Sequence, residues 1–191
     1  MRVGTKSVLF GAHCLLIHPF FVARGWSMLY GFPWTPSLWF AFGLHDIGYV
    51  GLNDMDGVEG EDHVLLGGRI MGWLFGERWA DFTVRHSRYW ARKHGVPVSK
   101  LCYADKLAFA MTPAWLYLPM ARATGELAEY MQKSRDRQAG GSCFTDAERA
   151  QIESENPAVW LEGLQQYTRR WVEEHQQGGV DVWAVPDNAA G

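Results

Sequence analysis

Apolar positions recur every three or four residues along most of this chain, and the strict alternation typical of half-buried strands is scarce. This periodicity predicts an all-α fold, with about seven helices packed around one core. A kink or break is expected at Pro19, because proline lacks the amide hydrogen that a helix interior needs. The segments with the helical pattern lie at about 5–22, 36–48, 61–75, 78–93, 99–111, 114–133 and 157–175.

Local signals indicate where helices and loops begin. Thr145 is followed three residues later by Glu148, the pattern of a capping box at a helix start. The chain ends in "GGVDVWAVPDNAAG", which lacks helical periodicity. We therefore expect one compact domain over residues 1–175 and a flexible C-terminal tail over residues 176–191.

Composition restricts the class of protein. The chain has 191 residues, 48% of them hydrophobic, so one domain can bury a core without disulfides. A net charge of −3 without blocks of like charge argues against binding a nucleic-acid polymer. No uninterrupted apolar run reaches the about 18 residues of a membrane span. An odd number of cysteines, Cys14, Cys102 and Cys143, favours a reducing compartment, so a cytoplasmic protein is expected.

Several polar side chains fall on helix faces that are otherwise apolar. A single histidine on such a face is usually a core residue with a hydrogen-bond partner, but a buried aspartate is rarer and needs a partner. Here four histidines and two aspartates occur on five successive segments, and one shared metal centre explains them together. The predicted metal ligands are His18, His45, Asp46, His63, His86 and Asp105.

His45 and Asp46 are adjacent at the end of the apolar run "WFAFGL". Consecutive helical residues point about 100° apart, so the two side chains can serve different sides of one site. The two oxygens of Asp46 can bridge two metal ions while His45 binds one. Imidazoles with carboxylates suit iron, manganese, cobalt, zinc or nickel, so two divalent transition metals are expected.

The order of these residues resembles the H…HD…H…H…D signature of the HD-domain superfamily, with supporting segments "HDIGY", "EDHVLLGGRIM" and "YADKLA". The resemblance covers about residues 10–115. It implies an all-α, metal-dependent enzyme with a binuclear centre held by the six residues. Tyr49 stands where HD-GYP phosphodiesterases have lysine, and the GYP triplet is absent, so hydrolysis of cyclic dinucleotides is not expected.

The resemblance implies a metal-dependent phosphohydrolase that acts on a nucleotide or other small phosphate ester through a metal-activated water. Asp46 would be catalytic as the bridging ligand, and Arg88 and Lys106, each within a turn of a ligand, are candidates to bind phosphate. One alternative is an HD-type di-iron oxygenase for a small organic substrate such as a phosphonate or polyol. Another is a non-catalytic HD regulatory domain. The oligomeric state stays open.

Two assignments also stay open at this point. His13 lies on an apolar face and is an alternative first ligand, although His18, 27 residues before His45, fits the family spacing better. Asp54 and Asp56, in the acidic loop after the doublet, are weaker candidates for the mouth of the site.

Overall fold

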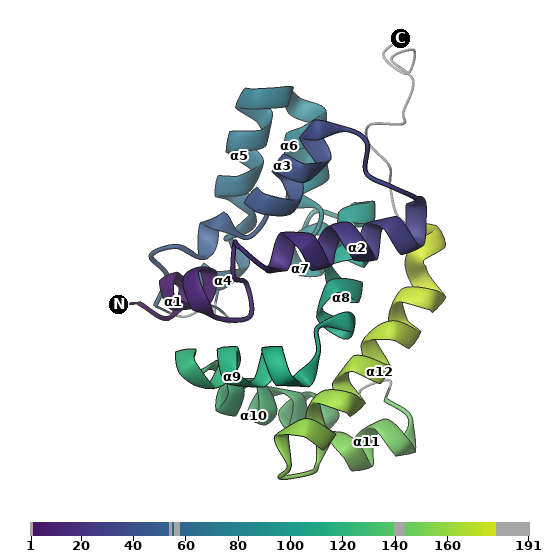
Figure 1. Cartoon of the computed structure of the whole chain (residues 1–191). Helices are drawn as coiled ribbons and strands as arrows, with labels where there is room; N and C mark the ends of the chain where they lie inside the picture. Colours follow the sequence, from purple (N-terminus) through teal and green to yellow (C-terminus); the bar gives the residue numbers. More distant parts are fainter. Residues whose placement is uncertain (1, 54, 56–57, 140–143, 179–191) are drawn as a thin grey trace.

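The computed structural model describes residues 2–53, 55, 58–139 and 144–178 (Figure 1). These residues are mostly helical and contain no β-strand, which confirms the predicted all-α class. The helices are α1 (Val3–Phe10), α2 (His18–Tyr30), α3 (Pro36–Leu44), η1 (Ile47–Tyr49), α4 (Val58–Glu61), α5 (Val64–Phe75), α6 (Glu77–Val84), α7 (Arg88–Lys93), α8 (Lys100–Met111), α9 (Ala114–Thr124), α10 (Glu126–Ala139), α11 (Asp146–Ile152), α12 (Pro157–His175) and η2 (Gln176–Gly178). Of the predicted tail, residues 179–191 lie outside the described part.

The predicted first helix is wrong in extent, because residues 11–17 separate α1 from α2. Pro19 does not cause the break. It lies in the first turn of α2, where a missing amide hydrogen is tolerated because that amide has no partner within the helix. The break leaves His18 as the first residue of α2 and places His13 in the connecting segment.

Two other predicted helices are each divided in two. Between α6 and α7, the hydroxyl of Ser87 accepts a hydrogen bond from the backbone N–H of Trp90 and caps α7. Between α9 and α10, Gly125 adopts a left-handed conformation with φ of 88°. By contrast, the capping box at Thr145 and Glu148 is confirmed at the start of α11. The break between α6 and α7 places His86 in the turn before α7.

Two clusters of buried side chains form most of the core. The first surrounds Trp26 and Phe42 and joins α2, α3, α5, α6 and α8. The second surrounds Trp160 and joins α9 to α12. Helix α8 lies between the two groups and packs against α2 and α12 (Figure 1). The helices of the first cluster and those of the second therefore meet along α8.

Glycines allow an unusually close approach around the His45–Asp46 doublet. A Cβ atom on Gly67 of α5 would overlap the carbonyl oxygen of Leu44, and one on Gly48 would overlap the carbonyl oxygen of His63. Only residues without a side chain fit these positions. The end of α3 therefore lies directly against the start of α5.

The surface carries several large exposed aromatic side chains, including Trp34 (82% exposed) and Trp73 (85% exposed). Among the helices of the described residues, none combines the length and apolar character needed to cross a bilayer.

Candidate metal centre

The structure brings the six predicted ligands together in two groups that could each hold a metal ion. Within each group, the potential ligand atoms lie within 4.8 Å of one another. Asp46 belongs to both groups. One group contains His18, His45, Asp46 and Asp105, and the other contains Asp46, His63 and His86.

Most of these side chains are placed by helix ends. His18 begins α2, His45 follows the last residue of α3, and His63 precedes α5. Asp105 alone lies well inside a helix, α8. Sequence reasoning placed the ligands on inward helix faces; the structure shows that helix termini converge on one point instead.

Three of the histidines are oriented in the same way. Nδ1 of each ring bonds the backbone carbonyl three residues earlier. The bonds run from His45 to Phe42 (3.1 Å), from His63 to Gly60 (2.6 Å) and from His86 to Thr83 (2.7 Å). Because a carbonyl oxygen only accepts, each Nδ1 carries the hydrogen, and Nε2 is the atom of each ring that is left to bind a metal ion. This arrangement is typical of metal-binding histidines.

The lone pairs of these Nε2 atoms face groups that do not complement them. Nε2 of His63 lies 3.2 Å from Nε2 of His86. Nε2 of His45 is buried, has no hydrogen-bond partner and lies 3.1 Å from Oδ2 of Asp46. Lone pairs and anionic oxygens repel unless a cation or a proton lies among them. The donor set and its orphaned nitrogen therefore fit a bound metal ion.

The electrostatics of the two groups point the same way. Burial disfavours the charged form of His45, but the neighbouring carboxylates of Asp46 and Asp105 outweigh it and raise the pKa of His45 to about 10. Burial, with the neighbouring His86, lowers the pKa of His63 to about 3. The first group thus attracts positive charge strongly, and the second keeps an imidazole neutral, the form that binds metals.

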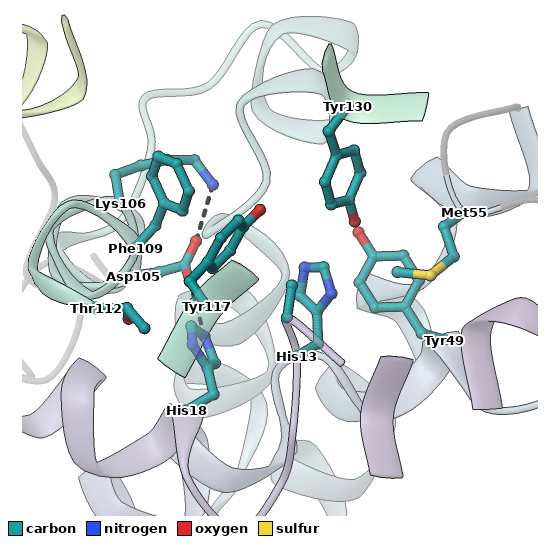
Figure 2. A pocket seen from close by; sticks show the side chains of 11 residues that line it. His13, His18, Tyr49, Met55, Asp105, Lys106, Phe109, Thr112, Tyr117 and Tyr130 are labelled. Atoms are coloured by element: carbon teal, nitrogen blue, oxygen red, sulfur yellow. Dashed lines mark hydrogen bonds and ion pairs between the residues drawn. The ribbon is translucent and has the colours of Figure 1, made fainter. Parts of the chain in front are cut away.

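Asp105 is held from two sides. Its Oδ1 lies 3.0 Å from Nε2 of His18, and its Oδ2 accepts a hydrogen bond of 2.8 Å from Nζ of Lys106 (Figure 2). Despite its burial, the carboxyl keeps a pKa well below its usual range because of the Lys106 charge and the histidine hydrogen bonds. Lys106, predicted to bind phosphate, is therefore paired with a predicted metal ligand.

Two cavities meet at this centre. The smaller, of about 250 Å³, lies on the His18 and Asp105 side (Figure 2). The larger, of about 560 Å³, is bordered by His63 and His86. His13, Tyr49, Asp105 and Lys106 border both.

The larger cavity is rich in cationic side chains. Arg88, predicted from the sequence, and Arg92, which was not, both line it together with Lys106. The guanidinium of Arg88 lies 4.2 Å from the ring centre of Trp171 on α12, which fixes its position. Arg85 is paired with Asp81 at 2.7 Å.

His13 belongs to neither ligand group. Its Nδ1 lies 2.9 Å from Oγ of the buried Ser7 and 4.0 Å from Oε1 of Glu126. Burial lowers the pKa of His13. The structure therefore places His18 among the ligand atoms and His13 on the wall of both cavities. Asp54 and Asp56 lie outside the described residues.

Sequence reasoning missed the other residues around the smaller cavity. Tyr117 and Tyr130 come from α9 and α10, far along the chain from the doublet. Glu126 is almost completely buried and accepts a hydrogen bond of 3.0 Å from the Tyr130 hydroxyl. In the sequence Glu126 falls inside the predicted helix 114–133, and no signal distinguishes it from an exposed acidic residue.

No family model, curated protein or solved structure matches this chain. The fold and the site together define an all-α protein with clustered histidines and aspartates that could hold metal ions, in an arrangement compatible with an HD-type site.

Proposed function

We propose that this protein is a two-metal phosphohydrolase of the HD type, acting on a nucleotide or other small phosphate ester. The observation that carries the proposal is the position of Asp46, which is shared by two groups of ligand atoms. A bridging carboxylate with separate histidines on either side suits a pair of divalent ions. The chain order H…HD…H…H…D supports the same assignment.

The two ions would have different surroundings. His18, His45 and Asp105 would hold one ion with Asp46, and His63 and His86 would hold the other. When bound, a pair of divalent ions lowers the pKa of a water and stabilises charge on a phosphoryl oxygen.

The chain's own side chains supply recognition of the phosphate. Arg88, Arg92 and Lys106 line the larger cavity with Asp46, Glu61 and Asp105, so these cations would attract an anion once divalent ions offset the carboxylates. Arg88 is held against Trp171, so its planar donors are already oriented before substrate binds. A cavity of about 560 Å³ suits a small molecule.

Metal analysis and an activity screen test this proposal. Purified protein should contain stoichiometric transition metal and release phosphate from phosphomonoesters when supplied with manganese, cobalt, zinc or iron. Asp46→Ala should lose both metal and activity, because both ligand groups lose their shared member. His94→Ala is the matched control, since His94 is an exposed histidine outside both groups. Retention of metal and activity in Asp46→Ala would refute the proposal.

A di-iron oxygenase is the second candidate, because four of the six ligand side chains are imidazoles, which suit iron as well as zinc or nickel. Oxygen consumption by the iron-loaded protein, without phosphate release from any ester, would select the oxygenase. Absence of stoichiometric metal would instead favour a non-catalytic regulatory domain.

A further inference from the structure

The smaller cavity is lined by both charged and aromatic side chains. The charged group, with two predicted metal ligands, consists of Asp105, Lys106 and His18. The apolar and aromatic lining consists of Ala12, Met55, Phe109, Tyr49, Tyr117 and Tyr130. This combination suits a ligand that carries both an anionic group and an apolar group.

The aromatic residues form two facing walls. In Figure 2, Phe109 and Tyr117 lie on one side of the cavity, and Tyr49, Met55 and Tyr130 lie on the other, with His13 between them. Phe109 and Tyr117 pack edge to face, with ring centres 5.3 Å apart at an angle of 73°. Because aromatic side chains have few rotatable bonds, these walls order a ligand at low entropic cost.

The wall opposite is fixed by the metal ligands themselves. The ring of Tyr49 stacks on His63 with centres 4.0 Å apart and planes within 9°. His63 in turn is fixed by its bond to the Gly60 carbonyl. The position of Tyr49 on this wall is therefore set by a predicted metal ligand.

The volume limits what fits. At about 250 Å³ the cavity is just below the about 300–1,000 Å³ typical of sites for drug-sized ligands. A cavity of about 150 Å³ is enough to bind benzene, so one flat ring with its substituents fits in this space.

We infer that this cavity binds the alcohol part of the substrate as one flat aromatic ring, so that the protein prefers phosphomonoesters of ring-bearing alcohols to those of small alkyl alcohols. The inference rests on the proposed function for the phosphate end of the molecule. In that hydrolysis the bond between phosphorus and the alcohol oxygen breaks and water oxygen bonds to phosphorus. A water proton passes to the alcohol, which leaves from the aromatic cavity.

Binding of two non-hydrolysable probes tests the inference without relying on turnover. Phenylphosphonate and methylphosphonate carry the same anionic group and differ in the ring. Titration calorimetry on the zinc-loaded protein should give at least tenfold tighter binding of phenylphosphonate. Equal affinities for the two probes would overturn the inference and leave the proposed function standing. Binding of neither would overturn both.

Variants of Phe109 locate the ring. Phe109→Ala should weaken phenylphosphonate binding by about three- to tenfold, as expected for loss of one aromatic contact, and leave methylphosphonate binding unchanged. Phe109→Leu keeps most of the volume and should show the same selective loss, with zinc stoichiometry and circular dichroism reporting an intact fold. Trp115→Ala is the control, because Trp115 lies on α9 near Tyr117 but is 75% exposed. Equal weakening of both probes in the Phe109 variants would count against a ring site.

Discussion

Lys106 shows how one side chain supports the geometry of another. Its ammonium binds the Asp105 oxygen that does not face His18, so Asp105 is oriented from outside the ligand group. Partners of this kind fix the direction in which a ligand presents its lone pairs. The same residue borders both cavities, so it can also contribute to binding an anion.

Replacing Lys106 by methionine separates these roles. Lys106→Met keeps most of the length of the side chain but removes the charge, and we expect metal affinity to fall by about 10- to 100-fold, the usual effect of losing an outer partner. Competition with a chromophoric chelator measures this affinity. Lys133→Met, which removes a surface lysine paired with Glu129, should leave it unchanged. Unaltered metal affinity together with a raised KM would assign Lys106 to phosphate binding alone.

The six residues that meet at the centre could be predicted from the sequence, but the orientation of their side chains could not. Buried histidines and aspartates on successive segments predict a shared centre, because each is costly to bury alone. The bond from Nδ1 to a carbonyl three residues earlier depends on exact turn geometry at each helix end. The choice between His13 and His18 also depended on where the first helix is interrupted. Pro19 predicted the interruption at the wrong position.

At the scale of elements, the contact between the end of α3 and the start of α5 positions His45 and Asp46. It requires glycine at position 67, where a Cβ atom would overlap the Leu44 carbonyl. The sequence showed small residues one turn after His63. It did not show that they pack against the end of α3, because that helix is a separate segment of the chain.

Gly67→Ala should push α3 away from α5. We expect a loss of about 1–3 kcal/mol in the free energy of unfolding, as for other overpacked sites, with weaker metal binding because His45 moves from its partners. Chemical denaturation and metal titration measure the two effects. Gly43→Ala is the matched control, since a Cβ atom there meets nothing within 4 Å, and it should stabilise α3 by about 0.5–1 kcal/mol. Similar behaviour of the two variants would show that the close contact is unimportant.

At the scale of the molecule, the centre ties together segments from residue 18 to residue 105. The sequence predicted the all-α class and most helical segments, because periodicity is a local signal. It did not predict the aromatic cavity, whose walls come from α8, α9, α10 and the segment after α3. The shape of such a cavity depends on the packing of helices that are far apart in the sequence, so no local sequence pattern predicts it.

Metal removal should therefore lower the stability of the whole fold. At a free zinc concentration 100 times the dissociation constant, binding to the native state alone adds about 2.7 kcal/mol. For a chain of this size we expect a rise in Tm of about 5–10 °C over the chelated protein, measured by calorimetry. Asp46→Ala should show no such rise, because it lacks the shared ligand. An equal rise in that variant would indicate zinc binding elsewhere.

Part of the lining of the smaller cavity comes from a stretch of chain that holds no metal-ligand candidate. All six candidates precede residue 106, whereas Tyr117 and Tyr130 follow it, on α9 and α10. Substitutions in α9 and α10 can thus change the lining of the smaller cavity without replacing any of the six candidates. On the proposed function, we expect directed evolution restricted to these two helices to change the substrates that are accepted while the reaction is retained.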